Sequence, residues 1–286
     1  MGIITDIILP LSLAFIMFSL GLSLTGSDFS RILKQPKDFI LGSISQIIIL
    51  PTVALLLILI WPLPPEIAIG VMLIAAAPGG ATSNIITSFS KGDVALSVSL
   101  TAVISLICVF TIPLIVLISL NIIMKTGLNS SISILDIALK MFFIVTIPVL
   151  LGMIFRKFLT NFSISFEPIA KNISAFLFAL VIIGAILSER NNIINYFSQA
   201  GLITLVLNLS MMLIAFYLAK YFASGESQQK AITIECGLQN GTLAIVVATT
   251  VFGGGIYLIP AATYSLIMFI TSLIYVFLIR RKDSLS

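Results

Sequence analysis

Residues 75–84 have the sequence AAAPGGATSN and interrupt an apolar segment that extends from about residue 66 to residue 90. Proline lacks a donor N–H and glycine is a weak helix former, so the Pro78-Gly79-Gly80 triplet cannot continue a regular helix. Residues 234–242, with the sequence IECGLQNGT, interrupt a second apolar segment and add a carboxylate and two amides to it. We therefore expect two broken helices.

The composition around these two segments is that of a membrane protein. Of the 286 residues, 59% are hydrophobic and 9% are charged, whereas a soluble domain has about 25% charged residues. Backbone polar groups in a bilayer must be satisfied within the segment, and the alternation of a β-barrel is missing from the sequence. The fold class predicted is therefore an all-α polytopic membrane protein. The net charge of +4 reflects loop residues and does not indicate a nucleic-acid partner.

Polar residues divide the chain into about nine transmembrane helices, each close to the roughly 20 apolar residues that a bilayer requires. The expected spans are residues 4–24, 38–60, 66–90, 93–121, 133–156, 170–188, 199–222, 227–251 and 256–279.

Basic residues are concentrated on one side of these spans. The loops after the first, third, fifth and seventh spans, together with the C-terminus, carry Arg31, Lys34, Lys37, Lys91, Arg156, Lys157, Lys171, Lys220, Lys230, Arg280, Arg281 and Lys282. The other side carries Lys125 and Arg190. Because cytoplasmic loops have the excess of lysine and arginine, we expect a multi-pass protein of the inner (cytoplasmic) membrane. Its N-terminus is expected outside and its C-terminus in the cytoplasm.

The two interrupted spans occupy corresponding places in the two halves of the chain and run in opposite directions. Such a pair is the sequence sign of inverted repeats, in which two discontinuous helices bring their breaks together near the middle of the membrane. Free carbonyls at the breaks can coordinate a cation, and the N-termini of the half-helices can meet an anion. The pattern predicts a secondary transporter.

Oxygen atoms gather around the breaks. Glu235 is expected at mid-membrane depth, where a carboxylate is costly unless it is paired or hydrated; the alternative is a structural polar residue at a helix contact. Ser97, Thr101 and Ser105 share one face of the fourth span, and Gln46 adds an amide in the second. The alternative for the hydroxyls is a hydrogen bond to their own i−4 carbonyl.

Neutral oxygens with one carboxylate suit a hard monovalent cation. The sequence has no histidine, so an imidazole-based triad is excluded and no enzyme is expected. Three alternatives remain at this stage: a sodium-coupled transporter, a proton-coupled transporter with Glu235 as the proton carrier, and a non-concentrative channel or sensor.

Three motifs resemble those of the bile acid:sodium symporter family in its bacterial branch. They are residues 77–84 (APGGATSN), residues 91–98 (KGDVALSV) and residues 234–240 (IECGLQN), and the resemblance extends over the whole chain. It implies a single transporter unit over 1–286, in which two unwound helices cross. A panel domain would comprise about 1–36 and 133–190, and a core domain about 37–132 and 191–286. Bacterial relatives typically have ten spans, and this chain corresponds to nine of them.

The resemblance also implies two bound sodium ions. One site would use Ser83, Asn84, Ser97, Thr101 and Glu235. The other would use Gln46, Glu235, Gln239 and the backbone carbonyls of Cys236 and Leu238. Substrate would lie between core and panel, against Gly80, Ala81, Thr82, Asn240 and Gly241.

One departure from the family concerns the last span. Some bacterial relatives have a histidine–asparagine pair where this chain has Met268 and Phe269. The function expected is sodium-coupled import of a small organic anion, either a pantoate-like carboxylate or a bile-acid-like molecule. Because the polar pair is missing, the compact acid is at least as plausible as the bile acid.

Overall fold

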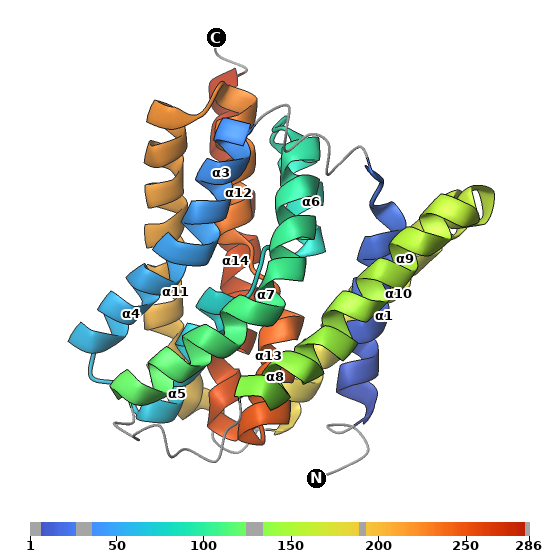
Figure 1. Ribbon diagram of the computed structural model, residues 1–286. Coiled ribbons are helices and arrows are strands. Elements are labelled where there is room, and N and C mark those ends of the chain that lie inside the picture. Colours follow the sequence, from blue (N-terminus) through green and yellow to red (C-terminus); the bar gives the residue numbers. More distant parts are fainter. Residues whose placement is uncertain (1–6, 27–35, 124–133, 189–192, 284–286) are drawn as a thin grey trace.

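The computed structural model describes residues 7–26, 36–123, 134–188 and 193–283, and the regular secondary structure of these residues is helical (Figure 1). Six stretches are long and apolar enough, by length and composition, to cross a membrane: Pro36–Ile60, Val94–Ile123, Leu135–Phe158, Thr160–Gly184, Phe197–Phe222 and Gly255–Arg281. The chain is therefore a polytopic helical membrane protein, as its composition predicts.

Four helices are continuous elements of the described chain. They are α1 (Leu9–Ser23), α7 (Val94–Ile123), α10 (Thr160–Ser188) and α11 (Ile193–Phe222). Another stretch begins with the 3-10 turn η4 (Gly255–Leu258) and continues as α14 (Ile259–Asp283).

Two stretches contain a wider π-helical turn. One consists of α3 (Pro36–Ile44), η2 (Ser45–Ile49) and α4 (Leu50–Ile60), and the other of α8 (Ile134–Met141), η3 (Phe142–Thr146) and α9 (Ile147–Phe158). A proline, Pro51 or Pro148, follows each π turn and has no N–H for the carbonyl four residues earlier. Gln46 lies in the first of these turns.

The two broken helices occur where the sequence predicts them. The first consists of α5 (Pro65–Ala76) and α6 (Ala81–Phe89), and the second of α12 (Glu226–Gly237) and α13 (Gly241–Phe252). Ala77 and Gly80 are extended in the first break, and Leu238 is extended in the second. The Pro-Gly-Gly triplet and the Gly-Leu-Gln-Asn-Gly run therefore end one half-helix and begin the next.

Helices α1, α9 and α10 pack on one another and lie together on the right of Figure 1. Glycines allow α1 and α9 to approach closely: a Cβ at Gly21 would meet the carbonyl oxygen of Val149, and one at Gly152 would meet that of Phe18. Small residues at helix contacts are typical of membrane proteins, because they let backbones approach. The broken helices pack mainly with α7, α11 and α14, and α13 also contacts α1 and α10.

One boundary differs from expectation. Helix α10 begins at Thr160, ten residues before the predicted residue 170, and only Leu159 separates it from α9. Pro168 lies inside α10, and an internal proline costs a helix one hydrogen bond without ending it here. Of the basic residues used for the orientation, Arg31, Lys34, Lys125 and Arg190 lie outside the described residues.

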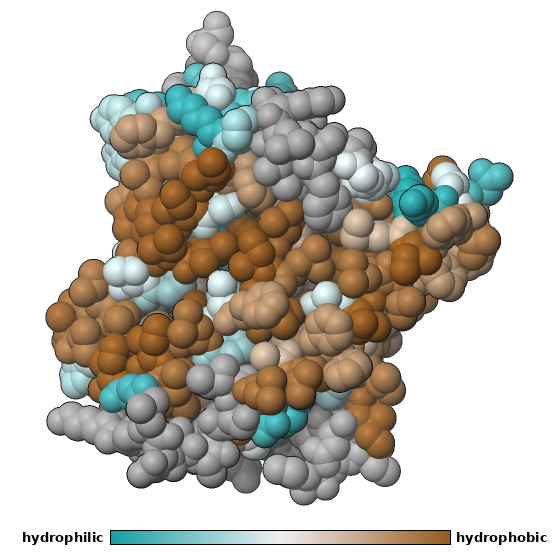
Figure 2. Space-filling model, in the orientation of Figure 1, coloured by the Kyte–Doolittle hydropathy of each residue, from teal (hydrophilic) through white to brown (hydrophobic). Residues whose placement is uncertain are grey.

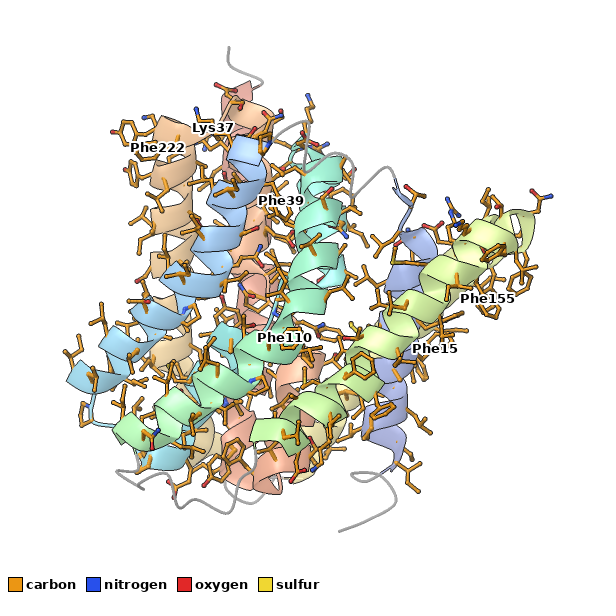
Figure 3. The ribbon with its side chains drawn as sticks, viewed as in Figure 1. Phe15, Lys37, Phe39, Phe110, Phe155 and Phe222 are labelled. Carbon is orange, nitrogen blue, oxygen red and sulfur yellow. The ribbon has the colours of Figure 1, made fainter. Side chains whose placement is uncertain are left out.

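The described surface has an apolar middle and a polar end. Figure 2 shows hydrophobic residues over most of this face and hydrophilic residues at its upper end. Phe110 of α7, with 75% of its surface exposed, lies in the apolar region, and Lys37 lies at the polar end (Figure 3). Hydrogen bonds from the Ser224 amide to Asp38 and from the Asp93 amide to the Ser227 carbonyl join three helix ends there. This distribution suits a protein whose sides contact lipid.

Candidate functional site

The two breaks lie against each other in antiparallel orientation. The amide of Gly80 donates to the carbonyl of Leu238 at 3.3 Å, and the amide of Asn240 donates to the carbonyl of Pro78 at 2.8 Å. Gly79 is paired with Gln239 between them. Helix ends leave backbone groups without partners, and here each break supplies partners for the other. We refer to residues 77–80 and 238–240 as the crossover.

Glu235 lies one turn before the second break and is fully buried. Its Oε2 accepts hydrogen bonds from Ser83 Oγ at 2.5 Å and from Ser97 Oγ at 2.7 Å, and its Oε1 accepts one from Thr101 Oγ1. Ser97 Oγ is also 2.8 Å from Oδ1 of Asn84. Helices α6, α7 and α12 therefore bring all five residues expected at the first ion site into one cluster.

The hydroxyls of α7 differ in their partners, and Ser105 Oγ is buried without one among the described residues. Ser99 and Ser119 donate to carbonyls of their own helix four residues earlier, at 2.7 and 2.6 Å. Ser97 and Thr101 donate instead to the carboxylate of Glu235. The i−4 alternative therefore describes Ser99 and Ser119, and not the two hydroxyls on the face that meets α12.

Two glutamines border the crossover. Oε1 of Gln46 accepts from the amide of Gly79 at 3.0 Å, and Nε2 of Gln239 donates to the carbonyl of Cys236 at 3.0 Å. Their other polar atoms, Gln46 Nε2 and Gln239 Oε1, are buried and form no hydrogen bond with the described residues. A buried polar atom without a partner is costly, so Gln239 Oε1 is an oxygen ready for a further ligand.

Glycine is required beside the carboxylate. A Cβ at Gly79 would collide with Oε1 of Glu235, so the second residue of the Pro-Gly-Gly triplet both opens the helix and leaves room for the acid. The triplet therefore has a steric role at the site in addition to its conformational one.

Glu235 lies in this centre without a basic partner. None of the ion pairs among the described residues involves Glu235, and a buried carboxyl group is stable only when a cation or a proton offsets its charge. Each hydroxyl has one donor and two acceptor lone pairs, so the same oxygens can stabilise the carboxylate or turn their lone pairs to a cation. The described residues contain no group of three or more His, Cys, Asp and Glu side chains suited to a transition metal.

The residues expected to contact substrate fall into two different environments. At the N-terminus of α6, Ala81 is exposed and Thr82 is partly exposed. At the N-terminus of α13, Oδ1 of Asn240 accepts from the amide of Leu243 at 3.0 Å, and a Cβ at Gly241 would collide with Oγ of Ser265 in α14. The first half-helix end is therefore open, and the second is covered.

Comparison with known proteins identifies the family of this chain. Residues 10–196 match the model of the sodium bile acid symporter family. The chain belongs to this family. The chain is 33% identical over 264 residues to a sodium-dependent transporter of Bacillus subtilis, covering 88% of this chain and 77% of the relative.

Plant members are more distant. The chain is 27% identical over 253 residues to a probable sodium/metabolite cotransporter of Oryza sativa chloroplasts, and 28% over 254 residues to one of Arabidopsis thaliana. The alignments cover 87% and 88% of this chain but 58% and 62% of the relatives, so the chain spans about three fifths of their length. The family and these relatives are transporters. This symporter-family chain is accordingly a transporter and not an enzyme.

Sequence reasoning missed a second polar cluster of this symporter-family protein. Asn208 of α11 donates from Nδ2 to the carbonyl of Gly237 at 2.7 Å, and Tyr264 of α14 donates to the same carbonyl at 3.1 Å. Thr271 of α14 donates to Oδ1 of Asn208 at 2.6 Å. An asparagine inside a membrane span is a signal that could have identified Asn208, whereas Tyr264 and Thr271 have no such mark in the sequence.

Proposed function

We propose that this protein is a sodium-coupled symporter that imports a small organic anion. The observation that carries the proposal is the buried carboxylate of Glu235, surrounded by Ser83, Ser97 and Thr101 and lacking a basic partner among the described residues. The relatives in Bacillus subtilis and in plants are named as sodium-dependent transporters or sodium/metabolite cotransporters, which supports the same cation.

The proposal includes the two ion sites that the family resemblance implies. The first comprises Ser83, Asn84, Ser97, Thr101 and Glu235. The second comprises Gln46, Glu235, Gln239 and the carbonyls of Cys236 and Leu238, and the unpartnered Oε1 of Gln239 supports it. Glu235 would belong to both sites, so that one carboxylate compensates part of the charge of two ions.

Coupling would act through the crossover. A cation at these oxygens draws α6, α7 and α12 together, and this holds the N-terminus of α6 in place. That end is exposed at Ala81 and carries the positive end of a helix dipole, which favours an anion. Sodium would thereby raise the affinity for the anion, and the anion would raise the affinity for sodium by the same factor.

The proposed arrangement in the membrane has nine spans. They are the six long stretches, α1, and the two broken pairs α5–α6 and α12–α13. Helices α1, α8–α9 and α10 would form a panel and the remaining spans a core of two inverted repeats, with substrate between them. The N-terminus would lie outside and the C-terminus in the cytoplasm, which matches the placement of Lys37 at the polar end in Figure 3.

The substrate class is a compact, partly apolar carboxylate. Met268 is buried, and the ring of Phe269 in α14 packs edge to face on Phe178 of α10, with 6.1 Å between centroids. The apolar side chains of Met268 and Phe269 offer no hydrogen bond to the hydroxyl groups of a steroid acid. A pantoate-like acid is therefore the first candidate substrate, and a bile-acid-like molecule is the second.

Transport by purified protein in vesicles tests this function. A thermal-shift screen of small carboxylates, in sodium and in potassium, first selects the acid that stabilises the protein. That acid should accumulate in the vesicles against its gradient when sodium is outside. Its uptake should fall to background when choline replaces sodium. Accumulation driven by a pH gradient without sodium would indicate proton coupling, and equilibration without accumulation would indicate a channel; either result would contradict the proposal.

A further inference from the structure

We propose that Asn208, Tyr264 and Thr271 are positioning residues that set the cation affinity of the crossover without touching the cation. This inference rests on the proposed sodium coupling. The three side chains come from α11 and α14 and are at least nine-tenths buried. Asn208 and Tyr264 donate to the carbonyl of Gly237, the last residue of α12, and Thr271 acts on it through Asn208.

The carbonyls at the end of α12 have different partners. Ile234 O accepts from the amide of Leu238 at 2.9 Å and Cys236 O from the side chain of Gln239 at 3.0 Å. Gly237 O accepts from Asn208 and Tyr264 instead. The last carbonyls of a helix have no partner within the helix, so this pair of donors fixes the direction of the peptide group between residues 237 and 238.

That peptide lies between the two proposed carbonyl ligands. Cys236 O precedes Gly237 and Leu238 O follows it, so the 237–238 peptide is the link that sets the spacing between them. Gly237 also packs closely on α11, because a Cβ there would lie 2.6 Å from Cγ of Met212. Met212 and Asn208 are four residues apart on α11, which places them on the same face of that helix.

The cluster is internally complete. Nδ2 of Asn208 also lies 3.1 Å from Oη of Tyr264, and Thr271 orients the amide by donating to Oδ1 at 2.6 Å. The glutamines at the crossover, in contrast, each retain a buried polar atom without a partner among the described residues. A satisfied network is suited to hold a backbone rigidly, and unsatisfied atoms are suited to receive a ligand.

Three variants test the inference: Tyr264→Phe, Asn208→Ala and Thr271→Val. The measurement is saturable binding of radioactive sodium to the purified full chain, together with the half-saturating sodium concentration for uptake. Loss of one neutral hydrogen bond corresponds to about a five-fold change. We therefore expect a rise of about five-fold for Tyr264→Phe and a larger rise for Asn208→Ala, with maximal uptake at saturating sodium preserved.

Matched controls exist on the same two helices. Thr204 of α11 and Thr263 of α14 are buried hydroxyls that donate to carbonyls of their own helix at 2.7 and 2.8 Å. Thr204→Val and Thr263→Val should leave the half-saturating sodium concentration unchanged. A second readout is the ratio of lithium to sodium affinity, which should change in the three cluster variants because the carbonyl positions change.

The outcomes are distinct. If the three residues have a purely structural role, their substitution would lower thermal stability equally in sodium and in potassium. The half-saturating sodium concentration and the ratio of lithium to sodium affinity would then stay unchanged. This result would overturn the inference and leave the proposed function standing. An absence of sodium binding in the unmodified protein would overturn both the inference and the proposed function.

Discussion

At the scale of single residues, the contacts of Glu235 make specific demands on its neighbours. Three hydroxyl donors, two of them from one helix, surround the carboxylate, and Gly79 leaves no space for a larger residue beside it. Substitutions at these contacts should change the half-saturating sodium concentration, and matched control substitutions separate this effect from an effect on folding.

Gly79→Ala should weaken sodium binding strongly. The added methyl group would meet Oε1 of Glu235 and displace the carboxylate from the hydroxyls. We therefore expect a rise of about five-fold or more in the half-saturating sodium concentration, on the basis of an overpacking cost of about 1–3 kcal/mol. Gly201→Ala in α11 is the control, since no atom lies within 4 Å of a Cβ there. Equal sodium dependence in both variants would contradict the assigned geometry.

Ser97→Ala and Ser99→Ala form a second comparison on α7. Ser97 donates to Glu235, whereas Ser99 donates to its own helix at Ala95. Hydrogen bonds to charged groups contribute about 1.5–3 kcal/mol, so Ser97→Ala should raise the half-saturating sodium concentration about ten-fold or more and Ser99→Ala should not change it. Titration of uptake with sodium at constant ionic strength measures both, and a similar effect of the two substitutions would argue against the cluster.

Much of the candidate site was predictable at this scale because polar residues in apolar segments are conspicuous. Glu235, Gln46, Ser97 and Thr101 stand out in this way, and the structure brings them together at the crossover. Ser105, predicted on the same face of α7, does not join them. The roles of Tyr264 and Thr271 were not predictable, because only the packing of α14 on α11 and α12 reveals which tyrosine and threonine meet a free carbonyl. The steric role of Gly79 likewise required the position of the carboxylate.

At the scale of the elements, the breaks followed from proline and glycine chemistry, but the start of α10 did not. The polar residues from Thr160 onward and the proline at 168 are typical of a loop, and the predicted span therefore starts at residue 170. The helix is instead supported by local pairs: Phe162 stacks on Phe166 with 5.4 Å between centroids, and Lys171 pairs with Glu167 at 2.6 Å. Residues four apart on a helix face each other, and this spacing was the signal that could have located the start.

The contact of α1 with α9 gives a prediction about stability. Gly152→Ala places a methyl group against the carbonyl of Phe18, and overpacking costs about 1–3 kcal/mol. We expect a clearly lower melting temperature of the detergent-solubilised protein. Gly184→Ala in α10, where a Cβ would meet no atom within 4 Å, should leave the melting temperature unchanged or slightly raised. An equal melting temperature for Gly152→Ala and the parent protein would show that α1 and α9 do not pack this closely.

At the scale of the whole molecule, the two broken helices occupy corresponding places in the chain but differ in their surroundings. Both contain a broken helix, yet the end of α6 is exposed at Ala81 and the end of α13 is covered at Gly241 by Ser265. The corresponding places of the two breaks in the sequence would predict equal exposure of the N-termini of α6 and α13. The difference arises from the packing of α14 on α13, which local patterns do not encode.

The proposed orientation is testable with single cysteines. The native Cys108 and Cys236 are buried and should react little with a membrane-impermeant maleimide. Ser224→Cys, at an exposed position in the polar end, should be labelled only after the cells are permeabilised. Pro62→Cys, exposed between α4 and α5, should be labelled in intact cells. The reverse pattern would place the N-terminus in the cytoplasm.

The most direct test of the central claim is equilibrium binding of radioactive sodium to the purified protein and to its Glu235→Gln variant. Glutamine keeps the size of the side chain and removes its charge, so thermal stability in potassium serves to verify that the variant is folded. The account predicts saturable sodium binding by the parent protein and loss of at least nine-tenths of that binding in the folded variant, because the carboxylate belongs to both proposed ion sites. Unchanged sodium affinity and capacity in a folded Glu235→Gln variant would contradict it.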